Sequence, residues 1–144
     1  MVVRKNIVDG ENNILHQKIE GVDAELNRKE FSSVLVHNMI EHKGIGLAAN
    51  QIGFAQRAFV MYIEAQPVVC YLPRITKVSK EKSRLAEGCL SYPGEEVEIE
   101  RPVAIGVKYE NEKGHQITRS LTGLESKCFQ HELDHLNGVT VMDY

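Results

Sequence analysis

The segment HELDH, residues 131–135, contains the residue types that most directly suggest chemistry. It has the pattern H-E-x-x-H. On an α-helix, four residues rise about 6 Å and rotate about 40° from the starting direction, so His131 and His135 share a face. Two imidazoles placed in this way can bind one metal ion, and Glu132 between them can reach a water molecule on that ion. The pattern therefore predicts a metal site with a general base.

A catalytic metal site needs a third protein ligand. Nine residues follow His135, with neither His nor Glu among them, and Asp143 has their one carboxylate side chain, so we expect the ligand upstream. The candidates are several carboxylates, Cys70, Cys89 and His115. Cys70 lies in an apolar run and His115 beside a turn glycine. The sequence EGCLSYPG around Cys89 predicts a loop that can turn a thiolate toward the histidines, which favours Cys89.

The segment GIGLAANQ, residues 44–51, matches G-x-G-x-x-A, a pattern of dinucleotide-binding turns. Such a turn follows a strand and opens a helix. Here the segment follows a predicted helix and leads toward a predicted strand, so the context argues against a dinucleotide site. Its glycines instead permit another backbone to approach closely.

The elements that must position these residues begin with an amphipathic helix over residues 23–43. Its apolar residues recur at helical spacing, Asp23 is the predicted N-cap, and Gly44 is the predicted stop. Apolar or alternating runs then predict strands, and ENEKG at 110–114 predicts a hairpin turn. The runs are RAFVMYIE (57–64), VVCYL (68–72), VEIE (97–100), VAIGVKY (103–109) and HQITRSL (115–121).

The second predicted helix carries the H-E-x-x-H pattern. TGLE at 122–125 has the form of a capping box, with Thr122 at the N-cap and Glu125 at N3. Asn137-Gly138 predicts the end of this helix. Two faces follow from the helical spacing: an apolar one of Phe129, Leu133 and Leu136, and a neighbouring one of Leu124, Cys128, His131 and His135. Consecutive strands flanked by helices predict an α+β fold.

The composition is ordinary for a globular protein, with 42% hydrophobic and 26% charged residues. A formal net charge of −3 offers no basic footprint for nucleic acid or an anionic membrane. No apolar run approaches the ~20 residues of a membrane span, and the N-terminus lacks the apolar core of a secretory signal. Three cysteines, an odd number, argue against a disulfide framework. We expect one catalytic domain, residues 1–144, in the cytoplasm, without a nucleic-acid or membrane partner.

Three segments together, GIGLAANQ (44–51), EGCLS (87–91) and QHELDH (130–135), resemble the three motifs of the peptide deformylases, in the same order and at similar separations. The resemblance covers nearly the whole chain. It implies antiparallel β-sheets packed around a central C-terminal helix that carries H-E-x-x-H, with an additional N-terminal helix. It also implies that residues 44–51 form a strand-like wall of the active site.

The resemblance implies hydrolysis of the formyl group from N-formylmethionyl peptides, with release of formate. Cys89, His131 and His135 then bind a divalent metal, which is iron(II) in the family, with zinc, nickel or cobalt as possible occupants of purified protein. Glu132 is the general base and then the general acid. The Gln51 amide and the Leu90 N–H donate to the oxyanion. Gly46 leaves room for the Gln51 amide and offers its own backbone to the substrate.

The methionine side chain of such a substrate needs an apolar slot, and family position suggests one lined by Ile45, Leu85, Leu124 and Cys128. For Cys128 we expect a place beside the metal rather than on it, because a ligand there would crowd the helix. Asp134 and Arg101 are expected to form an ion pair that fixes the helix.

The chain departs from the family pattern in three places. Leu72 precedes Pro73 where members usually have Asn-Pro, and Glu95 and Glu96 stand where many have apolar or basic residues. The sequence also ends at VMDY, where typical bacterial members continue into a tail implicated in ribosome contact. We therefore expect a short form of the family, of organellar or viral origin or from the cytoplasm of a bacterium, that is monomeric and lacks that ribosome contact.

Alternative functions make different demands on the sequence. A zinc endopeptidase with the same H-E-x-x-H would need a third ligand downstream and an extended cleft, and neither is evident. A catalytic Cys89 with a histidine base would leave H-E-x-x-H without a purpose. A non-catalytic metal-binding module would not need Glu132 and Gln51. The hydrolysis of formyl-methionyl peptides uses all of these residues.

Overall fold

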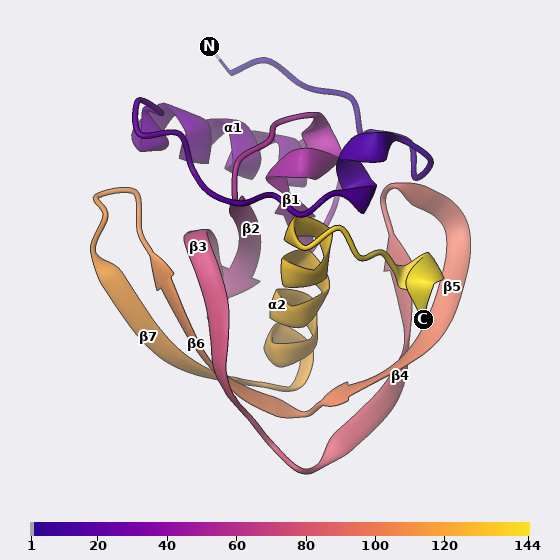
Figure 1. Cartoon of the computed structure of the whole chain (residues 1–144). Helices are drawn as coiled ribbons and strands as arrows, with labels where there is room; N and C mark the ends of the chain where they lie inside the picture. The colour runs from indigo at the N-terminus through magenta and orange to yellow at the C-terminus, as the bar shows by residue number, and fades with distance from the viewer. Residues whose placement is uncertain (1) are drawn as a thin grey trace.

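A five-stranded antiparallel sheet forms the larger part of the structure, a computed structural model that describes residues 2–144 (Figure 1). The strand order is β1-β2-β3-β6-β7. The hairpin turn predicted at 110–114 joins β6 to β7, where Glu110 pairs with Gln116. The strands are β1 Gly46–Ala48, β2 Ala58–Ile63, β3 Gln66–Val78, β6 Ala104–Glu110 and β7 Gln116–Thr122.

A second, two-stranded sheet consists of β4, Lys82–Cys89, and β5, Tyr92–Pro102. The predicted strand at 97–100 lies within β5, but the sequence did not predict β4. Most of β4 is exposed, so its residues lack the apolar alternation that identifies a strand. The placement of Cys89 in a loop was therefore wrong, because Cys89 is the last residue of β4 and pairs with Tyr92.

Helix α2, Gly123–Leu136, lies at the centre of the molecule with the sheets around it (Figure 1). The predicted apolar face packs on the larger sheet, and Phe129 meets Phe59 of β2 edge to face at 5.0 Å between ring centroids. The helix ends as predicted, with Asn137 as C-cap and Gly138 in the left-handed region at φ 76°.

The predicted capping box of α2 does not form. Thr122 occupies the N-cap position, but its side chain makes no capping hydrogen bond. The Glu125 carboxylate instead accepts a hydrogen bond of 2.8 Å from the backbone N–H of Glu64, in the turn between β2 and β3. The Glu125 carboxylate, which would have accepted from the Thr122 N–H in a capping box, is therefore bound to a residue of another element.

Helix α1, Arg28–Glu41, is shorter at both ends than predicted. Asn27, not Asp23, is its N-cap, and the Asn27 side chain accepts from the Glu30 N–H at 3.1 Å. At the other end, Lys43 and not Gly44 takes the left-handed conformation, at φ 57°. The left-handed residue that ends the helix is therefore one position earlier than predicted, and the Gly44 N–H that follows it donates to the Met39 carbonyl at 2.9 Å.

The two helices cover opposite faces of the larger sheet. Successive side chains of a strand point to opposite faces, and along β2 Phe59 and Met61 join the cluster with α2, whereas Ala58 and Val60 join the cluster with α1. The fold is α+β with a central helix, as predicted. No helix within residues 2–144 is long and apolar enough to cross a membrane.

Strand β3 is irregular at the position where the sequence departs from the family pattern. Its register with β6 shifts between Tyr71 and Arg74. Leu72 lies in the left-handed region at φ 50°, directly before Pro73. A leucine is strained there because its Cβ approaches the following carbonyl oxygen. Leu72 therefore puts backbone strain in the irregular part of β3.

Candidate metal centre

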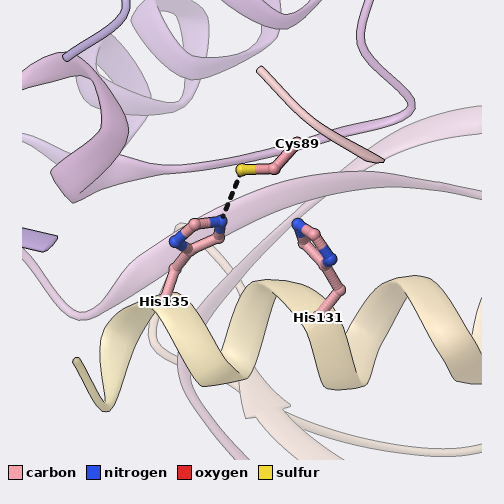
Figure 2. Close-up of side chains that lie close together, drawn as sticks. All are labelled: Cys89, His131 and His135. Atoms are coloured by element: carbon pink, nitrogen blue, oxygen red, sulfur yellow. Dashed lines mark hydrogen bonds between the residues drawn. The ribbon is translucent and has the colours of Figure 1, made fainter. Parts of the chain in front are cut away.

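Three side chains from two elements form a metal-ligand cluster. Cys89 comes from the end of β4, and His131 and His135 from one face of α2 (Figure 2). One ligand atom from each residue lies within 4.8 Å of the others, and the Cys89 Sγ is 3.3 Å from the His135 Nε2. The structure therefore brings together the three residues predicted from the motifs. It places the other candidate thiol, Cys70, in the buried core of the sheet.

Cys89 reaches the histidines because the β4–β5 pairing is irregular. The register shifts between Glu87 and Cys89. An irregularity of this kind re-aims the side chains that follow it. The two imidazoles lie one helical turn apart, with ring centroids 5.0 Å from each other.

Glu87 orients His131, a role that the sequence analysis missed. The His131 Nδ1–H donates to Glu87 Oε1 at 3.0 Å, which leaves Nε2 as the nitrogen that a metal would bind in exchange for its proton. Burial opposes the charge on both residues. The contacts with His131 and Arg101 nevertheless lower the pKa of Glu87 to about 2. The contacts with Cys89 and Glu87 likewise raise the pKa of His131 to about 10. Glu87 lies two positions before Cys89, so the prediction of a strand here would have put both side chains on one face.

Arg101 anchors Glu87 through a two-pronged contact. Its Nε and Nη2 donate to the two Glu87 oxygens at 2.6 and 2.9 Å. Its Nη1 donates to Asp134 Oδ2 at 3.0 Å, so the Arg101–Asp134 pair has the geometry predicted for it. Burial disfavours the charged guanidinium, but the contacts with Glu87 and Asp134 together outweigh burial and raise the pKa of Arg101. A paired charge of this kind can stay buried.

His135 is buried as a neutral imidazole. Burial, with the positive charges of His131 and Arg101, lowers its pKa to about 3. A neutral ring is the form that binds a metal. The side chain of Asn50 fixes this part of α2 by donating to the His135 carbonyl at 2.7 Å. The sequence analysis also missed Asn50, which no local pattern connects to the helix.

Glu132 lies in the wall of the site with one oxygen unsatisfied. Among residues 2–144 its Oε1 has no hydrogen-bond partner, although the side chain is 3% exposed. Burial raises the pKa of Glu132 to about 7, against the opposing effect of His131. A Cβ at Gly46 would lie 2.6 Å from Glu132 Oε2 and 2.9 Å from Cys128 Sγ. The glycine therefore admits the carboxylate, a reason that differs from the substrate contact expected from the sequence.

The Gln51 amide is held with its donor end toward the cluster. Its Oε1 accepts from the Ala48 N–H at 3.0 Å, and its Nε2 donates to Ser91 Oγ at 3.3 Å and to Cys89 Sγ at 3.5 Å. Gln51 belongs to a 3-10 turn, Ala49–Ile52, directly after β1. Leu90 follows Cys89 in the chain and lines the same cavity.

A cavity of about 670 Å³ opens onto these groups. Ile45 and Cys128 line it, as predicted for the apolar slot, but Leu85 and Leu124 do not, and they are 48% and 59% exposed. Further lining residues come from three places in the chain: Lys43, Glu87, Leu90, Tyr92, Pro93, Glu95, Glu96 and Lys127.

The residues present fit a divalent metal ion. One sulfur and two imidazole nitrogens converge, and the second histidine is neutral. Glu132 lines the same cavity and has an oxygen without a partner among residues 2–144, so its carboxylate suits the role of a base. This donor set suits zinc, iron(II), cobalt and nickel alike.

Comparisons with known proteins agree with this geometry. A family model described as polypeptide deformylase matches residues 4–144. The peptide deformylase of Thermotoga maritima is 43% identical over 117 residues, which are 81% of this chain and 71% of that protein. A crystal structure of the peptide deformylase from Thermotoga maritima matches with a TM-score of 0.93 and 37% identity, over 98% of this chain and 97% of that chain.

A second solved structure carries a peptide. It is the Met-Ala-Ser-bound crystal structure of the class I type b peptide deformylase from Acinetobacter baumannii. It matches this chain with a TM-score of 0.92 and 28% identity, over 99% of each chain. The family match and the structural match therefore extend over the two sheets and both helices.

Proposed function

The chain belongs to the polypeptide deformylase family, and we propose that it removes the formyl group from N-formylmethionyl peptides by metal-dependent hydrolysis, releasing formate and a free amine. One observation carries this proposal: the cluster of Cys89, His131 and His135 shares a cavity with a buried glutamate whose Oε1 has no partner among residues 2–144. This combination supplies a metal site and a base at one place.

Cys89, His131 and His135 would hold the metal, and Glu132 would handle the protons. A divalent ion in such a site lowers the pKa of a coordinated water toward neutrality. Glu132 accepts a proton from the attacking water as a general base, and then delivers it to the leaving amine as a general acid. Its burial next to Gly46 keeps the carboxylate pointed at the cavity.

The formyl oxygen gains negative charge as its carbon becomes tetrahedral. The Gln51 Nε2–H₂ is aimed at the cluster because the Gln51 Oε1 is bound to the Ala48 N–H. We assign this amide, with the backbone N–H of Leu90, as the oxyanion donors. Removal of one such donor typically costs about 10²–10³-fold in rate.

The substrate methionine would occupy the apolar part of the cavity, beside Ile45, Leu90 and Cys128. The Met-Ala-Ser peptide bound to the Acinetobacter baumannii deformylase supports a peptide ligand of this kind. Strand β1 lies at the edge of the larger sheet, so the backbone at Gly46 is available to pair with an extended peptide.

Iron(II) is the metal that we propose for the active enzyme, on the family resemblance. A ferrous ion beside a thiolate is sensitive to oxygen. Protein loaded with iron(II) under anaerobic conditions should therefore lose activity in air, while nickel- or cobalt-loaded protein retains it. Equal survival of all three forms in air would argue against iron as the working metal.

The test of the function is incubation of metal-loaded protein with formyl-Met-Ala-Ser. We expect release of formate, and a decrease of about 10²–10⁴-fold for Glu132→Gln. Glu41→Gln, an exposed glutamate on α1, is the matched control and should retain full activity. Cleavage of the internal peptide bonds without formate would instead identify an endopeptidase, and full activity of Glu132→Gln would remove Glu132 from the mechanism.

A further inference from the structure

Tyr144 lies against the outer side of Arg101, at the point where the C-terminal segment packs beside β4 and β5 (Figure 1). Its hydroxyl donates to Asp134 Oδ2 at 2.7 Å and accepts from Arg101 Nη1 at 3.2 Å. The centroid of its ring is 5.1 Å from the Arg101 Cζ. Tyr144 itself is 58% exposed, whereas Arg101 beneath it is 6% exposed. The tyrosine therefore forms part of the cover that separates the guanidinium from water.

A continuous chain of contacts leads from Tyr144 to the metal site. The Arg101 Nη1 donates to Asp134 and Tyr144, and its Nε and Nη2 donate to Glu87. Glu87 in turn accepts the Nδ1 proton of His131 at 3.0 Å. Each member holds the next through a charged hydrogen bond, which is the stronger class of such bonds.

We propose that Tyr144 is a positioning residue for the metal ligand His131, acting through Arg101 and Glu87. The inference rests on the proposed function, because it concerns the same metal site. The physical reason is the rigid planar fork of Arg101, whose edges are fixed together. Loss of Tyr144 leaves the Nη1 edge held by Asp134, whose Oδ2 then lacks the hydroxyl that also fixes it, so the guanidinium can rotate more freely and loosen both contacts to Glu87. The Glu87 carboxylate then orients His131 less firmly.

The two parts of Tyr144 contribute separately. The ring stacks on the guanidinium and excludes water, while the hydroxyl satisfies Asp134 and Arg101. Tyr144→Phe keeps the ring and loses the hydroxyl, and Tyr144→Ala loses both. Met142→Ala removes a half-exposed side chain from the same segment and is the control.

The first measurement uses neither metal nor activity. NMR on histidine-labelled protein stripped of metal follows the exchange of the His131 Nδ1 proton with solvent. We expect exchange to quicken in the order wild type, Tyr144→Phe, Tyr144→Ala, with Met142→Ala equal to wild type. The backbone amides of α2 should keep their wild-type exchange rates, since helix opening is a separate event. A purely structural role would accelerate the amides and the ring proton together.

The second measurement is the release of Co²⁺ to a chelator. Loss of a partner that orients a ligand typically weakens metal binding 10–100-fold, so we expect release about 10-fold faster from Tyr144→Ala, with Tyr144→Phe between it and wild type. Wild-type rates of ring-proton exchange and Co²⁺ release in Tyr144→Ala would overturn the inference, as would an equal effect of Met142→Ala. A wild-type protein that binds no Co²⁺ would instead refute the proposed function.

Discussion

At the scale of single residues, the site depends on groups that hold the reacting side chains in place. Glu87 fixes which nitrogen of His131 carries the proton, and Gly46 lets the Glu132 carboxylate into the wall of the cavity. Glu87 acts through a carboxylate oxygen, and Gly46 acts through the absence of a Cβ atom. Their removal should therefore affect the chemistry more than the fold.

Glu87→Gln tests the orientation of His131. The variant keeps the shape of the side chain but removes the charge that holds the His131 proton and the Arg101 fork. We expect metal affinity to decrease about 10–100-fold, measured by competition with a chelator. Glu98→Gln on β5, which is 64% exposed on its side chain, should leave the affinity unchanged. Equal affinities of Glu87→Gln and wild type would contradict the role of Glu87.

Gly46→Ala tests the close approach of Glu132. The added Cβ would lie 2.6 Å from Glu132 Oε2, so the carboxylate must move away from its position as base. We expect the release of formate to fall about 10²-fold or more, as for a misplaced base, while the protein remains folded. Gly21→Ala is the control, since nothing lies within 4 Å of a Cβ there. A fully active Gly46→Ala would show that the wall tolerates a methyl group.

At the scale of elements, strand β3 provides hydrogen bonds between the sheet and α1, which also packs against β1 and β2. The Tyr71 hydroxyl donates to the Arg28 carbonyl at 2.8 Å and accepts from Ser32 Oγ at 2.8 Å, both on α1. Leu72 then adopts its left-handed conformation and the register with β6 shifts. The docking of α1 and the irregularity of β3 are therefore adjacent, and each can be tested by substitution.

Leu72→Asn should relieve the strain at the irregularity. Asparagine tolerates the left-handed region far better than most residues, whereas alanine shares the Cβ clash of leucine. Both substitutions remove the apolar side chain, so their comparison isolates the backbone term. We expect the free energy of unfolding, measured by urea titration, to be about 1 kcal/mol higher for Leu72→Asn than for Leu72→Ala. Equal stabilities would mean that Leu72 is not strained.

Tyr71→Phe should change the stability at neutral pH and its dependence on pH. Loss of the buried hydroxyl costs about 1 kcal/mol at pH 7. Burial raises the pKa of Tyr71 above its ordinary value of 10.0. Above pH 10 the unfolded chain therefore releases this proton before the folded protein does, and wild-type stability falls with rising pH.

The alkaline decrease in stability should be shallower in Tyr71→Phe than in wild type. It should not vanish, because burial also raises the pKa of Tyr109. Urea titrations at several values between pH 8 and 11 measure both effects. Tyr62→Phe on β2 is the control, since Tyr62 makes no side-chain hydrogen bond within the described residues. Parallel pH curves for wild type and Tyr71→Phe would rule out the contribution of Tyr71.

At the scale of the whole molecule, the metal site adds a link between the small sheet and the central helix, which the Glu87–His131 and Arg101–Asp134 contacts already join. Cys89 ends one strand of the small sheet, and the two histidines belong to the central helix, which packs on the large sheet. A bound ion therefore links the β4–β5 hairpin to α2. The monomeric state, the cytoplasmic location and the lack of ribosome contact remain predictions from the sequence.

Metal binding should raise the melting temperature of the intact protein. A ligand at a thousand times its dissociation constant stabilises the folded state by about 4 kcal/mol, which for a chain of this size is a shift of about 10 °C. We expect this shift on addition of Co²⁺ to stripped wild-type protein, and its loss in Cys89→Ala. Cys70→Ala, in the sheet core, should be less stable but should still respond to Co²⁺. The same shift in Cys89→Ala would exclude the sulfur as a ligand.

The motifs, the α+β class and the set of three ligand residues follow from the amino-acid sequence alone. Helix spacing alone places His131 and His135 on one face, because the period of an α-helix is fixed by its hydrogen bonds. The residues around Cys89 favoured it as the third ligand through a predicted loop, which is the end of β4 in the structure, and the family resemblance implied the same residue. Local sequence also gave the end of α2 at Asn137-Gly138, since a left-handed glycine needs no tertiary partner.

Only the tertiary structure decided which groups orient those ligands. Glu87 was overlooked because β4 is exposed, and an exposed strand has no apolar alternation to reveal which side chains share a face. Thr122 and Glu125 matched a capping box, but Glu125 found a partner on another element. Local patterns record the period of a helix or strand, whereas contacts between elements distant in sequence depend on how those elements pack, and packing is a property of the whole chain.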